Sequence, residues 1–301
     1  MTGDGTGRDG RLAGAAVARV GFGAMQLEGR GRPLSDQDAV AVVRRAVELG
    51  VDHFDTAEFY GGGTVNRRLH AALAPYDDVV VVTKVGAETT DRGLALAQRP
   101  EQLRAAVEAN LRSLRMDRLP VVNLRRADQP PGLVATGDQV VDLDSQLAEL
   151  TALREAGKIA AIGLSNVDLG QLRAALPAGI VCVQNAYSVL HRDGEPLLQE
   201  CERHGIAWVP YFPLGSAFGG DAAGPHSSAS RPVPADPVVR AVAGRLGATP
   251  AQIGLAWLLQ HSPVTLLIPG TSGVAHLEQN VAAGRVRLDA AAVAELDRLA
   301  G

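Results

Sequence analysis

The sequence predicts a single (β/α)8 barrel (TIM barrel), the α/β fold in which eight parallel strands alternate with helices around a closed ring. Short apolar, β-branched segments alternate with segments of helical periodicity from residue 17 onward, a pattern typical of a parallel sheet. Eight strand segments can be counted, more than a doubly wound dinucleotide-binding fold requires. The Gly-x-Gly-x-x-Gly turn of that fold does not follow the first strand.

The strands are predicted from short runs of Val, Ile, Leu and Ala. They cover residues 17–24, 51–56, 79–85, 120–124, 159–164, 180–183, 206–211 and 264–268. Their length and the near absence of polar residues inside them are typical of strands covered on both faces. His53, next to the end of the second strand, is expected to point outward toward the helices.

The helices are predicted from apolar residues three or four positions apart and from their end residues. Ser35 and Thr249 are N-cap residues, Pro100 and Pro250 suit a first turn, and Gly157 ends a helix. The predicted helices cover residues 35–49, 64–73, 100–114, 145–156, 169–175, 195–203, 237–246, 251–260, 274–283 and 289–299. The intervening loop 215–234 is rich in Gly, Ala, Ser and Pro. It is longer than an ordinary connection and predicts a mobile lid.

Composition excludes several classes of protein. The chain has 301 residues, of which 46% are hydrophobic, and its longest apolar runs are far shorter than the roughly 18 residues of a membrane helix. A net charge of −4 and a pI near 6.0 argue against nucleic-acid binding. Cys182 and Cys201 are expected to be buried thiols, and no metal-ligand spacing joins them to the seven histidines. We therefore expect a cytoplasmic protein without nucleic-acid, membrane or metal partners.

Residues 1–14 differ from the rest of the chain. They are rich in Gly, Asp, Arg and Thr and have no apolar core of the kind found in a signal peptide. We expect a flexible leader at 1–14 and one domain from 15 to 301. Because charged residues are scattered and no apolar patch suggests an interface, we expect a monomer.

Three polar residues at the ends of neighbouring strands suggest proton transfer. Asp55 and Lys84 end the second and third strands, and Tyr60 follows Asp55 by five residues. Catalytic groups of a barrel gather at the C-terminal ends of its strands. A buried ammonium beside a phenol favours the phenolate, so we expect Lys84 to lower the pKa of Tyr60 from about 10 toward neutrality. Asp55 would keep Lys84 charged and oriented.

Seven short motifs occur together along the chain. They are GFGAM at 21–25, FDTAEFYG at 54–61, GLSN at 163–166, QNAY at 184–187, YFPLG at 211–215, IPGTS at 268–272 and HLEQN at 276–280. In this order they resemble the aldo-keto reductases, and the resemblance covers nearly the whole chain. It implies a (β/α)8 barrel that binds NADPH, sometimes NADH, and passes a hydride to the carbonyl carbon of an aldehyde or ketone.

The resemblance also implies roles for single residues. Tyr60 is the general acid, Lys84 lowers its pKa, and Asp55 anchors Lys84. The implied cofactor contacts are Gly23, Ser165, Asn166, Gln184, Tyr211, Pro213, Leu214, Gly270, Thr271, Ser272, His276, Gln279 and Asn280. Met25, Phe59 and Phe218 are expected to line the substrate pocket.

One position departs from the family pattern. The family usually has histidine at the end of the fourth strand, whereas this chain reads VVNLRR at 121–126 and places Arg125 there. A guanidinium donates hydrogen bonds but does not release a proton, so Tyr60 alone is expected to supply the proton. One such donor is worth about 2.7–4 kcal/mol in a dry site. Arg126 is expected to pair with Asp128 or Glu149.

The Asn-Leu-Arg version resembles a bacterial subgroup that includes pyridoxal reductases, so pyridoxal is the first expected substrate. Two other interpretations stay open. One is a tailoring ketoreductase of a biosynthetic pathway, and the other is a catalytically slow, NADPH-binding regulatory protein similar to potassium-channel β-subunits. Where the family's phosphate loop often has Lys and Arg, this chain has Gly270 and His276. We expect NADPH, with NADH possible.

Overall fold

The structure is a computed structural model that describes residues 8–29, 33–215 and 232–299. The predicted substrate residue Phe218 and most of the predicted lid at 215–234 lie outside these ranges.

Seven parallel strands form one curved sheet. In spatial order they are β3 (Phe22–Gly23), β4 (His53–Asp55), β5 (Val80–Val85), β8 (Leu119–Arg125), β9 (Ile159–Ser165), β10 (Ile180–Gln184) and β11 (Ala207–Trp208). Every neighbouring pair is parallel. Because the strands run in the same direction, all their C-terminal ends meet at one end of the sheet.

The segment 264–270 closes the sheet into a barrel. It makes isolated parallel bridges on both sides, Trp208 with Thr265 and Val20 with Leu267. Two backbone hydrogen bonds of 2.8 Å join it to the edges, from Leu266 to Trp208 and from Gly21 to Leu267. The predicted eighth strand therefore stands in its expected place, although its pairing is too irregular to form a continuous ladder. The (β/α)8 fold class is confirmed.

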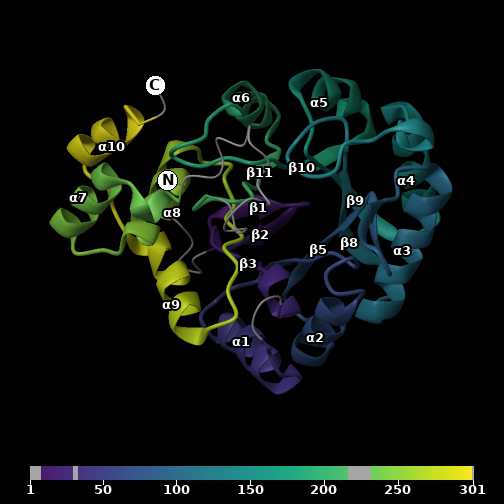
Figure 1. Cartoon of the computed structure of the whole chain (residues 1–301), viewed down its shortest axis with the longest axis horizontal. Helices are drawn as coiled ribbons and strands as arrows, with labels where there is room; N and C mark the ends of the chain where they lie inside the picture. The colour runs from purple at the N-terminus through teal and green to yellow at the C-terminus, as the bar shows by residue number, and fades with distance from the viewer. Residues whose placement is uncertain (1–7, 30–32, 216–231, 300–301) are drawn as a thin grey trace.

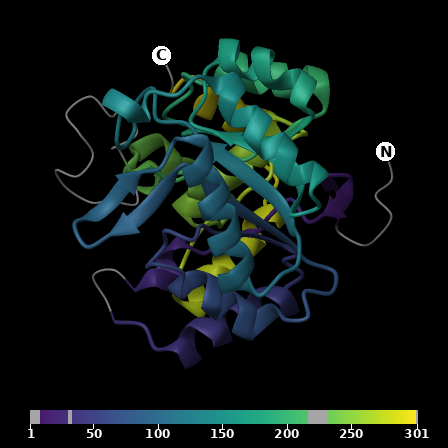
Figure 2. The same cartoon turned by 90° about the vertical axis from the view of Figure 1, so that its right-hand side faces the viewer.

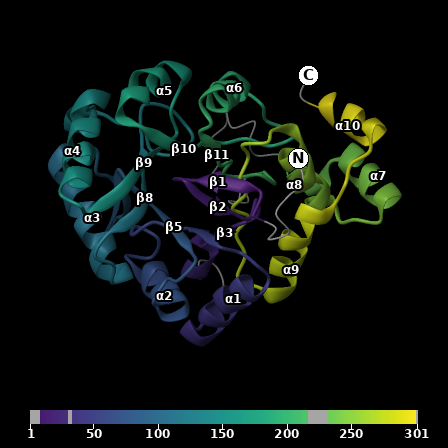
Figure 3. The same cartoon turned by 180° about the vertical axis from the view of Figure 1, so that it is seen from behind.

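Helices surround the barrel. They are α1 (Asp36–Glu48), α2 (Thr64–Leu73), α3 (Pro100–Leu114), α4 (Leu143–Glu155), α5 (Leu169–Ala175), α6 (Glu195–His204), α7 (Pro237–Leu246), α8 (Pro250–His261), α9 (Val274–Ala282) and α10 (Ala290–Asp297). Figure 1 shows most of them as an outer ring, with α7 and α10 beyond α8 at one corner, and Figure 3 shows the same ring from behind. The predicted caps are present: Ser35 Oγ accepts from the amide of Asp38 at 3.0 Å, and Thr249 forms a capping box with Gln252.

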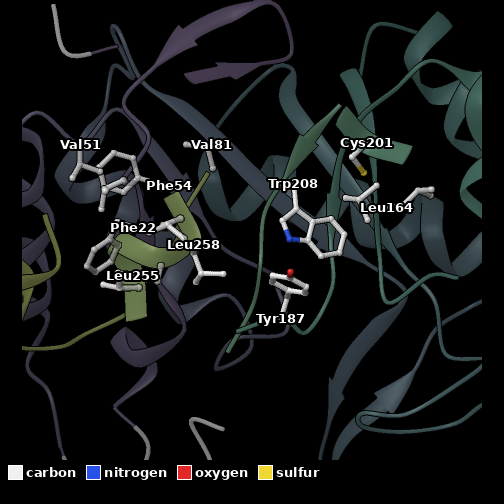
Figure 4. Close-up of a cluster of buried hydrophobic side chains, with 14 of the residues drawn as sticks. Phe22, Val51, Phe54, Val81, Leu164, Tyr187, Cys201, Trp208, Leu255 and Leu258 are labelled. Atoms are coloured by element: carbon white, nitrogen blue, oxygen red, sulfur yellow. The ribbon is translucent and has the colours of Figure 1, made fainter. Parts of the chain in front are cut away.

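The core has two layers, one on each face of the strands. Phe22, Phe54 and Val81 face outward and pack against the helices (Figure 4). Val82 and Val121 belong to a separate cluster inside the barrel. Successive residues of a strand point to opposite faces, which explains why strands such as 80–85 are apolar at nearly every position. Both cysteines are buried, as predicted, and the two tryptophans are buried as well.

An antiparallel hairpin closes the N-terminal end of the barrel. It consists of β1 (Gly10–Leu12) and β2 (Ala15–Val17). The expected flexible leader at 1–14 is therefore wrong over 10–12. The physical reason is burial: Leu12 and Val17 are each 1% exposed and belong to the cluster inside the barrel. The polar composition of residues 1–14 does not indicate that Leu12 fills the N-terminal end of the barrel.

A second hairpin, which the sequence analysis did not predict, stands at the opposite end. It comprises β6 (Ala87–Thr90) and β7 (Gly93–Leu96), inserted between β5 and α3. Figure 2 shows the two hairpins on opposite sides of the barrel, β1–β2 in purple near the N-terminus and β6–β7 in blue across from it. The β6–β7 hairpin thus overhangs the end where the strand C-termini meet. Within the described ranges no helix is long and apolar enough to cross a membrane.

Candidate active site

A buried ion pair lies at the C-terminal ends of β4 and β5. Lys84 Nζ is 2.5 Å from Asp55 Oδ1 and donates a second hydrogen bond to the carbonyl oxygen of Thr56 at 3.0 Å. Gln184, from β10 across the barrel, donates through Nε2 to Asp55 Oδ2 at 2.6 Å. Lys84 and Asp55 are 6% and 4% exposed. Because both carboxylate oxygens and the ammonium have partners, the ion pair is held in a fixed position inside this end of the barrel.

His53 shares the inward face with Asp55, so the expectation that it faces the helices is wrong. Residues two apart on a strand lie on the same side of the sheet. The His53 ring fits over Gly21, where a Cβ atom would lie 2.2 Å from Nε2. Asp52 Oδ1 is 3.6 Å from Nδ1, too far for a hydrogen bond, and neither ring nitrogen has a hydrogen-bond partner among the described residues.

Tyr60 lies in the loop between β4 and α2, next to the ion pair. Its ring centroid is 5.2 Å from Lys84 Nζ. Phe59 packs edge-on against this ring at 5.3 Å between centroids and is 7% exposed. Thr89 of the β6–β7 hairpin donates to the carbonyl oxygen of Phe59 at 2.9 Å. The hairpin therefore fixes the loop that carries Tyr60, and Phe59, predicted for the substrate pocket, lies beneath Tyr60 as its packing support.

The pKa of Tyr60 is raised, which is the opposite of the sequence-based expectation. Burial raises it most, and this outweighs the lowering by the charges of Lys84 and Arg125. Burial also opposes the charge on Lys84, but Asp55 and Tyr60 together raise the pKa of Lys84. Tyr60 is therefore a neutral phenol and Lys84 an ammonium at neutral pH. This is the protonation state in which Tyr60 can donate a proton.

The raised pKa of Tyr60 predicts a flat pH profile for carbonyl reduction. If Tyr60 gives up the proton, kcat/KM should stay constant from about pH 6 to about pH 9 and fall only above the usual tyrosine value of about 10. The measurement is kcat/KM across pH at saturating reduced cofactor, which reports the groups of the substrate-free enzyme. A decline centred near pH 7 would contradict the raised pKa.

A buried polar network braces the strand ends from outside the barrel. Thr56 Oγ1 donates to Asn66 Oδ1 at 2.8 Å, and Asn66 Nδ2 donates to Asn110 Oδ1 at 2.9 Å. Thr83, the neighbour of Lys84, donates to the same Asn110 oxygen at 2.6 Å. All four side chains are fully buried. The network ties α2 and α3 to the two residues that flank the ion pair, so it holds Asp55 and Lys84 in register.

Arg125 ends β8 at the same end of the barrel. Its Nη2 donates to the carbonyl oxygen of Pro131 at 3.3 Å, and its Nη1 is buried without a hydrogen-bond partner within the described ranges. Gln98, 2% exposed, donates to the carbonyl oxygens of Gly86 and Arg125 at 2.6 and 2.9 Å. Gln98 thereby joins the ends of β5 and β8. It was missed by sequence reasoning because one glutamine after a hairpin carries no motif.

Four predicted cofactor residues lie together beside the Lys84–Asp55 ion pair: Ser165, Asn166, Gln184 and Tyr211. Asn166 Nδ2 donates to the carbonyl oxygens of Arg126 and Gln129 at 3.2 and 2.8 Å, and its Oδ1 accepts from Tyr211 Oη at 3.3 Å. The side chain of Asn166 thus holds Tyr211 in place. Gln184 Oε1, in contrast, is buried without a partner in the described part of the chain. It is an acceptor suited to an incoming amide N–H.

Gly23 and Gly270, both predicted as cofactor contacts, have a packing reason to be glycine. They form the last bridge that closes the barrel. A Cβ atom on Gly23 would lie 2.4 Å from the carbonyl oxygen of Ile268, and one on Gly270 would lie 2.7 Å from the carbonyl oxygen of Gly23. Just beyond, Thr271 Oγ1 accepts from the amide of Gly273 at 3.1 Å and orders the turn into α9.

The remaining predicted residues follow β3 or β11, or lie just before or on α9. Ser272, His276 and Gln279 are exposed, whereas Met25 and Asn280 are half-buried. Leu214 packs against the α8 region, and its carbonyl oxygen accepts from the amide of Val233 at 3.0 Å. Pro213 bridges Gly215.

The structure thus places a buried Lys–Asp pair, a tyrosine and an arginine at the C-terminal end of a closed (β/α)8 barrel, the end at which barrel enzymes carry their active sites. Comparison with known proteins agrees with this class. The chain belongs to the aldo/keto reductase family, whose model matches residues 19–300. The predicted enzyme class, an NAD(P)H-dependent oxidoreductase acting on carbonyl groups, is thereby confirmed.

Known relatives span almost the full chain. Pyridoxine 4-dehydrogenase of Escherichia coli (strain K12) is 42% identical over 288 residues, which cover 94% of both chains. Two crystal structures of an aldo/keto reductase from Klebsiella pneumoniae are each 26% identical. The complex with NADP and acetate has a TM-score of 0.76 and aligns with 97% of this chain and 95% of its own. The complex with NADPH has a TM-score of 0.75, with coverages of 96% and 94%.

Proposed function

We propose that this protein uses NADPH to reduce an aldehyde or ketone to the alcohol, with Tyr60 as the proton donor. The observation that carries the proposal is the arrangement of Asp55, Lys84 and Tyr60: an ammonium paired with Asp55 lies 5.2 Å from the ring of a half-buried, protonated phenol. As the substrate oxygen gains negative charge, the phenol gives it a proton, and Lys84 stabilises the phenolate that remains.

The residues present fit a nicotinamide cofactor. Its carboxamide needs an acceptor, and Gln184 Oε1 is a buried acceptor without a partner among the described residues. Tyr211, held by Asn166, offers a ring on which a planar group can stack. Exposed Ser272 and the first-turn amides of α9 suit a phosphate. When bound, the reduced cofactor supplies the hydride, while the residues of the chain orient it and provide the proton.

Pyridoxal is the substrate that we propose to test first. The Escherichia coli relative is named a pyridoxine 4-dehydrogenase, and pyridoxine is the alcohol that results from reduction of pyridoxal. NADPH is proposed as the preferred cofactor because the Klebsiella pneumoniae structures hold NADP or NADPH. A tailoring ketoreductase or a slow regulatory protein would share the same barrel.

A steady-state assay with NADPH, NADH and a panel of aldehydes that includes pyridoxal tests the proposal. Turnover of pyridoxal with a lower KM for NADPH than for NADH is the expected result. Fluorescence titration of both cofactors gives their affinities independently of turnover. Tight NADPH binding without turnover of any aldehyde would contradict the enzymatic proposal and favour the regulatory one.

A further inference from the structure

Arg125 is a cation without a carboxylate partner in the described part of the chain. Its Nη2 makes one long hydrogen bond to the carbonyl oxygen of Pro131, and its Nη1 is buried without any. The next residue shows the opposite situation. Arg126 forms a bidentate pair with Asp128 at 2.7 and 2.8 Å and also donates to Gln146 and to the carbonyl oxygen of Val141. Arg126 is satisfied by the protein, whereas Arg125 is not.

Arg125 is held in a defined position although no carboxylate among the described residues pairs with its charge. Arg125 pairs in register with Ser165 of β9, and its carbonyl oxygen accepts from Gln98. Behind the guanidinium, a Cβ atom on Gly132 would lie 2.7 Å from Nη2, so the backbone presses directly against this group. The charge of Arg125 acts on both Tyr60 and Tyr211. Asn123, two residues earlier on β8, contacts Cys182 inside the barrel, so strand alternation directs Arg125 to the same inner side.

We propose that Arg125 makes this enzyme selective for carbonyl substrates that carry a second, anionic oxygen beside the reacting carbonyl. The class includes ortho-hydroxyaryl aldehydes in their phenolate form and 2-oxo acids. A guanidinium presents several N–H donors in a planar fork that suits two neighbouring oxygens. It can hold the reacting carbonyl and the anionic oxygen together. The inference rests on the proposed function and adds no chemical step, because it concerns only which substrates the site binds.

Arginine suits this role better than the histidine usual at this position in the family. A half-buried cation loses hydration, and a substrate anion restores the missing partner. Because arginine is always protonated, the selectivity does not depend on the charge state of the enzyme near neutral pH. Pyridoxal, with a ring hydroxyl next to the aldehyde carbon, belongs to the proposed class.

Matched substrates and variants of the full chain test the inference. The pairs are 2-hydroxybenzaldehyde against 2-methoxybenzaldehyde, and phenylglyoxylate against its methyl ester, measured with NADPH at a pH where the hydroxyl is ionised. The wild type should favour the anionic member of at least one pair by about 10- to 100-fold in kcat/KM, the range for a hydrogen bond to a charged group. The pair that shows the preference identifies the source of the anion.

Arg125→Met should reduce this preference to near one, mainly through KM, while Arg125→Lys should retain part of it. Arg112→Met is the matched control, because Arg112 is exposed on α3 and its side chain makes no hydrogen bond or ion pair with the described residues. Circular dichroism confirms that each variant is folded. Turnover of all four compounds without preference, or a preference that persists in Arg125→Met, would overturn the inference and leave the proposed function intact. Turnover of none, including pyridoxal, would overturn both.

Discussion

Replacing Tyr60 with phenylalanine is expected to lower kcat for carbonyl reduction by about 10²- to 10⁴-fold, the usual contribution of a general acid. The ring and its edge-on packing on Phe59 remain, so the loop should keep its shape. Lys84 retains its bonds to Asp55 and to the carbonyl oxygen of Thr56. The hydroxyl is lost, and with it the proton and the hydrogen bond to Lys84. The measurement is single-turnover reduction together with NADPH affinity by fluorescence, and the affinity should stay nearly unchanged.

Tyr76→Phe is the matched control for this prediction. Tyr76 is half-buried in the turn after α2, and its hydroxyl donates to the carbonyl oxygen of Leu114 at 2.7 Å. Removing that hydroxyl should cost about 0.5–1.5 kcal/mol of stability without changing kcat. If Tyr60→Phe kept more than about a tenth of the wild-type kcat, less than a general acid contributes, another group would be the proton donor.

The neighbourhood of Asp55, Lys84 and Gln184 could be predicted from the sequence for a simple geometric reason. Each residue ends a strand, and the ends of parallel strands meet at one edge of the sheet. The direction of each side chain could also be predicted, because side chains alternate between the two faces of a strand. For His53 this rule was applied wrongly. His53 is two residues before Asp55 and therefore had to point inward with it, which the structure shows through its contact with Gly21.

The pKa of Tyr60 could not be predicted because it is a balance of opposing effects. The sequence shows that a lysine is near, which lowers the pKa, but burial, the larger effect, depends on the fold. The β6–β7 hairpin and Gln98 are similar cases. Both fix the site through contacts to backbone carbonyl oxygens, and a backbone carbonyl leaves no trace in the sequence.

Arg125 and Arg126 show what the structure adds to a motif. In the sequence they are adjacent and chemically identical, and only the resemblance to a family distinguished them. In the fold, strand alternation sends them to different surroundings: Arg126 meets Asp128 and Gln146, while Arg125 faces the site, and its Nη1 has no hydrogen-bond partner among the described residues. What distinguishes the structural Arg126 from the proposed ligand-binding Arg125 is therefore that a carboxylate of the protein, Asp128, pairs with Arg126.

Replacing Lys84 with methionine is expected to lower both activity and stability. The change leaves the buried Asp55 carboxylate with Gln184 as its side-chain hydrogen-bond partner, and breaking a buried ion pair in this way costs about 3–5 kcal/mol. It also removes the charge that lowers the pKa of Tyr60, so the phenol becomes a weaker acid and kcat should fall by at least about 10²-fold. Urea unfolding and single-turnover reduction measure the two effects.

The double variant Asp55→Asn/Lys84→Met separates them. Removing both charges eliminates the unpaired carboxylate, so most of the stability should return while activity stays low. A double variant as unstable as Lys84→Met would show that lost packing, rather than the unpaired charge, causes the destabilisation.

The pH dependence of the free energy of unfolding tests whether the fold raises or lowers the pKa of Lys84. The pKa of Lys84 in the folded protein is raised above its usual value of 10.5. A group of this kind contributes stability that is fully present below its unfolded pKa and is lost as the pH rises through the folded pKa. The stability difference between wild type and Lys84→Met should therefore stay constant from about pH 6 to about pH 9 and shrink only in more alkaline solution. If, as the pH rises, the difference begins to shrink before about pH 9, burial lowers the pKa of Lys84 more than Asp55 and Tyr60 raise it.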